Sequence, residues 1–364
     1  MTNVPVATSH TPSTPGDTTV SLADAISQFS DPRGYLAVAS IGLPTRDAVV
    51  AIRADLDSWF AAERDPMGYD PVIERTRASY ASLVGVTPDR VAAGSQTSVM
   101  TSLVAAAVPV GAEVLCVDGD FSSIVFPFLQ RPDITVRSVG LDELAGAITD
   151  STWLVVFSLV QSATGVVADV AAITTAAREH GVYTLCDTTQ AAGVLPVDAR
   201  LFDATVCHTY KWLCAPRGVA FLTLSPGFER KLTPLQAGWY AGDQVWQSCY
   251  GPAMDLATDA RRFDVSPAWQ AWIGAEQTIG MFSRLDISEV WERVTGLGNA
   301  LCDGLGIPQQ NQAIVTWADA DSADLARISA AGIRASGRAG RLRASFHLWN
   351  DESDVETVLA ALRG

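Results

Sequence analysis

Residues 182–224, VYTLCDTTQAAGVLPVDARLFDATVCHTYKWLCAPRGVAFLTL, contain three short apolar runs of strand character, namely VYTLC, ATVCH and VAFLTL. Their continuous content of Val, Leu and aromatic residues is typical of strands that are buried on both faces. Similar runs begin at residues 112, 134 and 152, and helical stretches lie between several of them. This alternation predicts an α/β fold with a mainly parallel sheet that is covered by helices on both faces.

Outside this region the sequence pattern is mainly that of helices. Amphipathic stretches predict helices over residues 46–62 and 71–83. After about Pro252 the sequence is mostly helical in pattern, with a strand-like run RLRASFHLW and a predicted C-terminal helix over residues 351–362. We expect four parts: a disordered tail rich in Thr, Pro and Ser at 1–19, an N-terminal segment at 20–65, a large domain at 66–250 and a small C-terminal domain at 251–364.

Composition and charge narrow the class of protein. The 364 residues are 48% hydrophobic and 18% charged, as in an ordinary globular protein, and the net charge is −15 with a pI near 4.6. Such a charge repels nucleic acids and anionic membranes, and no local basic patch offsets it, so we expect a small-molecule partner. No segment has the length of apolar residues needed to span a bilayer, and the protein is expected to be cytoplasmic.

Cysteine and glycine spacing exclude two further classes of site. The six cysteines show no C-x-x-C spacing, and several lie in apolar runs, which favours reduced thiols in the core and no metal site. A dinucleotide fingerprint G-x-G-x-x-G after a strand is absent, which argues against a nicotinamide enzyme.

Lysine is scarce in this chain. Of 25 basic residues only Lys211 and Lys231 are lysines. Arginine supplies positive charge, but only a lysine amine forms a Schiff base once it is deprotonated by burial or by a neighbouring cation. Lys211 follows a strand-like run and stands beside Trp212, so it serves either amine chemistry or a structural contact with nearby carbonyls. Lys231, in the polar text FERKLTP, is expected on the surface.

Two further motifs accompany Lys211. Asp187 ends the first run in D-x-x-Q-x-x-G, together with Gln190 and Gly193, and Arg343 stands in R-x-S near the C-terminus. With these motifs in this order, the chain resembles the class V aminotransferase family of enzymes that depend on pyridoxal 5′-phosphate, particularly the branch of kynureninases, cysteine desulfurases and isopenicillin N epimerases. The resemblance runs from about Gly34 to the C-terminus. It implies fold type I, with a seven-stranded sheet in a large cofactor-binding domain and a smaller α+β domain.

The resemblance assigns the catalytic and ring-binding residues. Lys211 forms the Schiff base with the cofactor and then removes the Cα proton of the substrate. Asp187 pairs with the pyridine nitrogen, which lets the ring accept electrons, and Gln190 bonds the phenolic oxygen. Taken alone, an aspartate at a strand end such as Asp187 is more often a loop cap.

The phosphate group requires hydrogen-bond donors. Ser95, Gln96 and Thr97 lie between a glycine and an apolar helix, where free backbone N–H groups and the positive end of the helix dipole gather. An ordinary helix N-cap would give the same pattern. Near the lysine, His208 and Tyr210 occupy positions where relatives place phosphate ligands, although His208 also fits a core histidine.

The resemblance also places residues around the ring. Phe121 is expected to stack on the pyridine, where many relatives have histidine, unless it is a core aromatic. Ser162, in SLVQSATG with Thr164 and Gly165, faces the cofactor or substrate. Gly238 and Trp239 resemble a pair that reaches the phosphate of the neighbouring subunit. The chain is therefore expected to form a homodimer with shared active sites.

Arg343 is the expected ligand of the substrate α-carboxylate, because a guanidinium fork makes two parallel hydrogen bonds with it. Arg341 is a weaker candidate on the same face of the strand. The alternative is a surface arginine on an edge strand. Ser40, in the loop of residues 39–42, is expected to form the wall on the substrate side.

The resemblance implies an amino-acid substrate and chemistry at Cα, with two reactions on equal terms: transamination and β-elimination by a C–S lyase. Epimerisation is an alternative from the same family, and a non-catalytic protein that binds the cofactor or a metabolite is an alternative from another class. Residues 311–343 contain no cysteine, which argues against a desulfurase. The C–S lyases of the ergothioneine pathway lack that cysteine too, and the chain resembles them in its lysine and arginine motifs.

Overall fold

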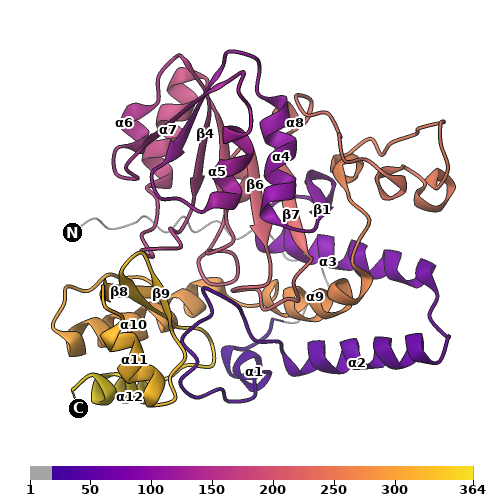
Figure 1. Ribbon diagram of the computed structural model, residues 1–364. Helices are drawn as coiled ribbons and strands as arrows, with labels where there is room; N and C mark the ends of the chain where they lie inside the picture. Colours follow the sequence, from indigo (N-terminus) through magenta and orange to yellow (C-terminus); the bar gives the residue numbers. More distant parts are fainter. Residues whose placement is uncertain (1–18, 364) are drawn as a thin grey trace.

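The computed structural model describes residues 19–363, so all of the tail expected at 1–19 except Thr19 lies outside the described residues. Its centre is a seven-stranded sheet with strand order β1-β7-β6-β5-β4-β2-β3 (Figure 1). The strands are β1 (Val91–Gly94), β2 (Glu113–Val117), β3 (Thr135–Val139), β4 (Thr152–Ser158), β5 (Tyr183–Asp187), β6 (Ala204–His208) and β7 (Ala220–Leu224). Only β7 runs antiparallel to its neighbours, so the predicted mainly parallel sheet is confirmed.

Both faces of this sheet are buried, because successive side chains of a strand point to opposite faces. In β4, Leu154 and Val156 belong to the core under α4 (Thr97–Ala107) and α5 (Ser122–Leu129). Val155 and Phe157 belong to the opposite core, together with residues of α3 (Asp70–Leu83) and α7 (Val170–His180). The continuous apolar strands of the sequence thus follow from burial on two sides.

A second, three-stranded antiparallel sheet lies in the C-terminal part, with order β8-β10-β9 (Figure 1). Its strands are β8 (Ile314–Ala318), β9 (Ser336–Arg338) and β10 (Arg341–Ser345). Of these, only β10 was expected from the sequence. The remaining longer helices are α2 (Arg46–Phe60), α9 (Trp269–Phe282), α10 (Ile287–Leu305), α11 (Ala323–Ala330) and α12 (Glu352–Arg363), with the short α1 (Leu22–Ser27), α6 (Leu144–Ala147) and α8 (Pro226–Glu229).

The N-terminal segment contacts both parts of the chain. Residues 34–37 join the C-terminal part through backbone hydrogen bonds, such as Leu36 N to the Arg334 carbonyl at 2.8 Å. Helix α2 instead packs against α9, which also packs against α3. The domain boundaries at residues 65 and 250 remain predictions. No helix within residues 19–363 is both long and apolar enough to cross a membrane.

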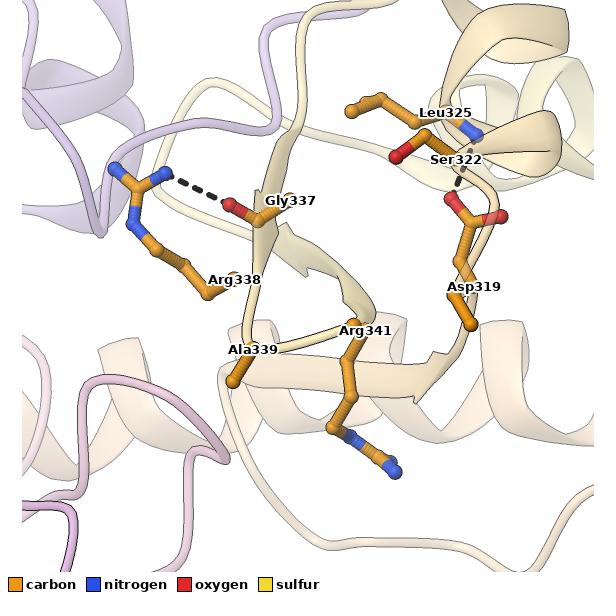
Figure 2. A pocket seen from close by; sticks show the side chains of 9 residues that line it. Asp319, Ser322, Leu325, Gly337, Arg338, Ala339 and Arg341 are labelled. Carbon is orange, nitrogen blue, oxygen red and sulfur yellow. Dashed lines mark hydrogen bonds between the residues drawn. The ribbon is translucent and has the colours of Figure 1, made fainter.

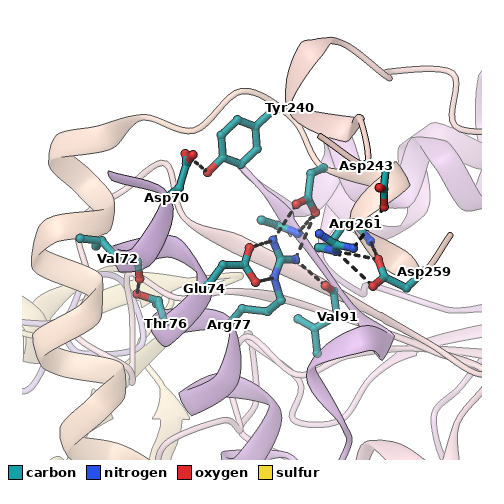
Figure 3. Close-up of polar contacts among 12 residues, drawn as sticks. Asp70, Val72, Glu74, Thr76, Arg77, Val91, Tyr240, Asp243, Asp259 and Arg261 are labelled. Carbon is teal, nitrogen blue, oxygen red and sulfur yellow. Dashed lines mark hydrogen bonds and ion pairs between the residues drawn. The ribbon is translucent and has the colours of Figure 1, made fainter. Parts of the chain in front are cut away.

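A buried ion pair fixes the end of β1 (Figure 3). The guanidinium of Arg77 on α3 bonds Asp264 through Nη2 at 2.6 Å, and its Nη1 bonds the Val91 carbonyl at 2.6 Å. Asp264 also accepts a hydrogen bond from the Ala93 N–H at 2.6 Å. Both side chains are almost fully buried, so each compensates the other's desolvation. The pair holds β1 at the edge of the sheet, directly before the loop that leads into α4.

Candidate active site

The chemical side chains lie at the carboxyl ends of neighbouring strands. Gly94 of β1 and His208 of β6 both pair with the same residue of β7, so they stand at one level of the sheet, about 10 Å apart. Asp187 ends β5 and pairs with β6 two residues before His208, and Ser158 of β4 pairs with Asp187. The loops that follow these strands therefore converge at one edge of the sheet, where α/β proteins bind ligands.

Lys211 lies in the turn after β6, and only 5% of it is exposed. Its Nζ stands 5.2 Å from the ring centre of Phe121 and 5.7 Å from that of Tyr210, and it has no hydrogen-bond partner among residues 19–363. Burial lowers the pKa of the amine from 10.5 to about 8, with Asp187 opposing and Arg343 reinforcing the shift. The lysine can therefore be neutral, and thus nucleophilic, near physiological pH.

Asp187 supplies a buried carboxylate close to this amine. Its Oδ1 accepts a hydrogen bond from the Thr189 N–H at 2.8 Å, whereas Oδ2 has no partner in the described part of the chain. Burial raises the pKa of the carboxyl group to about 6, against the lowering effects of Thr189 and Lys211. Thr189 Oγ1 also accepts from the His208 N–H at 3.0 Å, which fixes the loop against β6. A protonated ring nitrogen fits the free oxygen.

The start of α4 offers open backbone donors. Gln96 is the N-cap residue in extended conformation, and its side chain makes no capping hydrogen bond. Because the first N–H groups of a helix have no intrahelical partner, they are available to an anion. Thr97 is buried, Ser95 is half-buried and Gln96 is exposed. The three predicted residues thus stand at an uncapped helix start that fits a phosphate group.

His208 has a buried ring nitrogen, Nε2, without a hydrogen-bond partner in the described residues. Burial, together with the cations of Arg217 and Lys211, lowers the pKa of this histidine to about 4, so the ring is neutral. Its ring packs edge-on against Tyr210 at 4.4 Å, and the Arg217 guanidinium lies 4.3 Å from the Tyr210 ring centre. Such an unpaired nitrogen fits a ligand, and its assignment to the phosphate stays a prediction.

Phe121 is not a core aromatic, since 39% of it is exposed at the start of α5. The preceding residue, Asp120, accepts hydrogen bonds from the Ser158 N–H at 2.8 Å and from the Ser158 hydroxyl at 2.5 Å. These bonds fix the loop after β2 to the end of β4. The Phe121 ring is thereby held near Lys211, its stacking on the cofactor stays a prediction, and Asp120 is a positioning residue that the sequence did not reveal.

Gln190 is bound to protein atoms at both ends of its amide. Its Nε2 donates to the Ala39 carbonyl at 3.0 Å, and its Oε1 accepts from the Trp212 indole at 2.7 Å. Only one amide hydrogen is left for the predicted contact with the cofactor, which remains a prediction. His347, another residue that the sequence did not single out, bonds the Trp212 carbonyl through Nε2 at 2.9 Å and stacks on that indole. These residues brace the turn that carries Lys211.

Gly42 lies directly against the lysine turn. Its N–H donates to the Tyr210 carbonyl at 2.8 Å, and a Cβ at this position would stand 2.0 Å from the Lys211 carbonyl oxygen. No side chain fits at that separation. The loop of residues 39–42 therefore packs against the turn that carries Lys211, and its role as the wall on the substrate side stays a prediction.

Arg343 lies on the central strand β10, and only 3% of it is exposed, so the alternative of a surface arginine on an edge strand is wrong. It donates to Ser336 Oγ at 3.0 Å, to Ser40 Oγ at 2.9 Å and to the Ser162 carbonyl. All three acceptors are neutral, and burial lowers the pKa of the guanidinium to about 10. A buried cation without a carboxylate partner among the described residues fits the carboxylate of a substrate.

Ser162 and Ser40 thus enter the site as supports of Arg343. Arg341 does not join them, because its guanidinium donates to Oγ1 and to the carbonyl of Thr316 at 3.1 and 3.0 Å. It lines a pocket of about 380 Å³ beside the β9–β10 hairpin instead (Figure 2). None of the other predicted site residues lines that pocket, so it is separate from the lysine site.

Trp239, in the short helix η4 (Trp239–Ala241), lies away from this group. Its ring stands 5.0 Å from that of Trp246 and edge-on to Tyr240, and the side chains of Tyr240 and Trp246 both bond Asp70. Within residues 19–363 no hydrogen bond, ring contact or cation–π contact joins Trp239 to Lys211. Its predicted role across a subunit interface stays a prediction.

Comparison with known proteins agrees with this geometry. Residues 134–338, more than half of the chain, match the family model described as aminotransferase class-V. The chain belongs to this family. It is 31% identical over 183 residues to the isopenicillin N epimerase of Streptomyces clavuligerus, a match that covers 45% of the chain and 46% of that relative. The chain thus spans less than half the length of this relative.

Two further relatives match along most of the chain. A probable cysteine desulfurase of Methanothermobacter thermautotrophicus is 24% identical over 381 aligned residues, which cover 89% of the chain and 92% of that protein. The solved structure of the cystine C–S lyase C-DES with cysteine persulfide superposes with a TM-score of 0.81 at 21% identity, covering 91% of the chain and 97% of that structure. Another C-DES structure contains glycine covalently linked to its pyridoxal phosphate cofactor. The family and fold are therefore shown, whereas the relatives' names describe different reactions.

Proposed function

We propose that this protein is a pyridoxal phosphate-dependent C–S lyase that removes the Cα proton of an S-substituted cysteine and eliminates the sulfur substituent. One observation carries the proposal: Lys211 is buried with a pKa of about 8, and the charges of the Asp187 carboxylate and the Arg343 guanidinium both act on its amine. An amine, an acid for the ring nitrogen and a carboxylate ligand are the three groups that chemistry at Cα of an amino acid requires.

The cofactor would be held by residues already described. Lys211 Nζ would bind its aldehyde carbon, Asp187 its ring nitrogen, and the N–H groups at the start of α4 together with His208 its phosphate. Phe121 would cover the ring. When bound, pyridoxal phosphate supplies a conjugated ring that takes up the electron pair left at Cα.

The chain's own residues orient the substrate and move the proton. Arg343 would bind the α-carboxylate while Ser336, Ser40 and the Ser162 carbonyl hold its guanidinium in place. Lys211 Nζ would accept the Cα proton, and the Cβ–S bond would break with the sulfur leaving as a thiol. Together with one water molecule, the substrate then gives pyruvate, ammonium and the thiol.

Sulfur transfer to a protein cysteine is not supported by this site. Cys207 and Cys214, which lie near Lys211 in the sequence, are both buried, and burial raises the pKa of Cys207 to about 12 and raises that of Cys214 further. Thiols that stay protonated are poor nucleophiles. The likeness to a cystine C–S lyase supports direct elimination, which needs no such thiol.

We further propose that the protein acts as a homodimer. Large apolar side chains are exposed on α2 and in the segment after Trp239, among them Phe60, Tyr250 and Met254. Because Trp239 does not reach Lys211 of its own chain in the described residues, a role at the phosphate would have to be played in a second copy. Size measurement of the purified protein tests this, and a fully active monomer would contradict shared sites.

The absorption spectrum of the purified protein, followed by borohydride reduction and peptide mapping, tests the cofactor assignment. We expect a yellow protein whose reduced cofactor maps to Lys211. The Lys211→Ala variant should lose this adduct. The Lys231→Ala variant should keep it, because Lys231 is an exposed residue that follows β7 in the chain and is not one of the predicted site residues. A wild-type protein that forms no adduct with added cofactor would refute the assignment.

Product analysis then separates the reactions. S-substituted cysteines should yield pyruvate and free thiol in equal amounts. A keto acid that retains the sulfur substituent would indicate transamination, and an inverted amino acid without keto acid would indicate epimerisation. Either result would replace the lyase proposal while leaving the cofactor assignment intact.

A further inference from the structure

A group of arginines shares one face of the small sheet. In the β9–β10 hairpin, Arg343 pairs with Ser336 and Arg341 pairs with Arg338. Directly opposite residues of an antiparallel pair point to the same face, and so do residues two apart on one strand. Arg338 is therefore the diagonal neighbour of Arg343 on that face, at about 7–8 Å between backbones.

Arg338 is not used by the fold. Its guanidinium is exposed, its recorded hydrogen bond is to the carbonyl of Gly337 at 2.7 Å, and no acidic partner lies within ion-pair distance among residues 19–363. Figure 2 shows its side chain extending away from Asp319 and from Arg341. Asp319, which lines the same pocket, already accepts hydrogen bonds from the N–H groups of Asp324 and Leu325, both at 3.0 Å.

The exposed arginines of this chain are of two kinds. Some, such as Arg200 and Arg327, bind carboxylates at 2.8 Å, and others, such as Arg230, have no carboxylate partner among residues 19–363. Arg338 is of the second kind, and it is also the diagonal neighbour of Arg343, a buried cation that likewise has no carboxylate partner in the described residues. Two neighbouring cations repel each other, so the pair is destabilising unless a ligand compensates it.

The electrostatic effect of Arg338 reaches the catalytic group. Its charge contributes to the lowered pKa of Arg343 and, more weakly, to that of Lys211. Together with the pairing of β9 and β10, this places Arg338 on the side of the small sheet where Arg343 would bind a substrate.

We propose that Arg338 is a specificity-determining residue, which binds a second anionic group on the substrate side chain while Arg343 binds the α-carboxylate. The substrate class is then an amino acid whose side chain ends in a carboxylate or another anion. This inference rests on the proposed function for the role of Arg343, and it names the charge of the substituent that the lyase would release.

Calorimetric titration of the protein with non-reacting acids tests the inference without turnover. Succinate and glutarate are compared with propionate and butyrate, which lack the second carboxylate, at low ionic strength because salt screens exposed charges. The proteins are wild type, Arg338→Gln, Arg338→Lys and the control Arg327→Gln. Arg327 is an exposed arginine of α11 paired with Asp324, so its substitution removes the same charge from the same region.

We expect wild type to bind at least one dicarboxylate about tenfold more tightly than its monocarboxylate counterpart, which corresponds to about 1.4 kcal/mol. Arg338→Gln should abolish the preference, Arg338→Lys should restore part of it, and Arg327→Gln should leave it unchanged. Equal binding of both acid classes by wild type, or a preference that survives in Arg338→Gln, would overturn the inference. Failure to bind pyridoxal phosphate would refute the proposed function alone, because the acid preference is measured independently.

Discussion

The titration of Lys211 in the cofactor-free protein gives the most direct quantitative test of the site. Burial lowers the pKa of its amine from 10.5 to about 8. At pH 7 this leaves about one amine in ten deprotonated, compared with about one in 3,000 for an unshifted lysine. The buried environment thus increases the reactive form about 300-fold, which is the physical basis for rapid binding of an aldehyde cofactor.

The measurement is made by NMR with lysine labelled at the ε carbon. Because the chain contains only Lys211 and Lys231, two resonances are expected, and the Lys231→Ala variant assigns them. The Lys211 resonance should titrate with a midpoint near 8. A midpoint near 10.4, the value of a lysine in water, would refute the argument from burial.

Two variants test the sign of the electrostatic contributions. Arg343→Gln removes a cation that lowers the pKa of Lys211, so the midpoint should rise. Asp187→Asn removes a carboxylate that raises this pKa, so the midpoint should fall. Shifts in the opposite directions would mean that these groups do not act on the amine as their positions imply.

Three further predictions concern stability and pH. Gly42→Ala should destabilise the fold by about 1–3 kcal/mol, because its Cβ would meet a backbone carbonyl at 2.0 Å, whereas Gly68→Ala meets nothing within 4 Å; equal melting temperatures would contradict this. Asp264→Asn should cost about 3–5 kcal/mol in denaturant unfolding by leaving Arg77 buried without a counter-charge, and the control Asp198→Asn, in an exposed pair, about 1 kcal/mol or less. Titration by NMR should give a carboxyl pKa of Asp264 near 6, above the usual 3.8, because burial outweighs the ion pair with Arg77; a value at or below 3.8 would show that the ion pair outweighs burial.

The sequence predicted most elements of the large sheet because their apolar runs are long enough to read. The sequence did not predict β1, whose four residues VAAG are mostly small, and it did not predict β8 or β9. β9 is three residues long and contains no apolar residue. Such strands are defined by pairing with a neighbour, so their own sequence carries little information about them.

Some residues of the candidate site were predicted from the sequence, and others were recognised only in the structure. Lysine scarcity and the family resemblance carried by three motifs were enough to predict Lys211, Asp187 and Arg343 as site residues, because each of these predicted roles depends on one type of functional group. The sequence did not indicate that Ser40 and the Ser162 carbonyl would support Arg343, that Gln190 would be bound to Trp212, or that Asp120 would orient Phe121.

By itself the sequence determined the family and the sheet type, and it predicted the residues with chemical roles, since these follow from local composition and from the order of motifs along the chain. Only the tertiary structure decided the pKa of Lys211, the neutral surroundings of Arg343 and the position of Arg338 beside it. The first two properties depend on burial and on residues distant in the sequence, such as Ser40 beside Arg343. The third depends on the pairing of β9 with β10. Neither kind of contact leaves a periodicity or spacing in a single sequence.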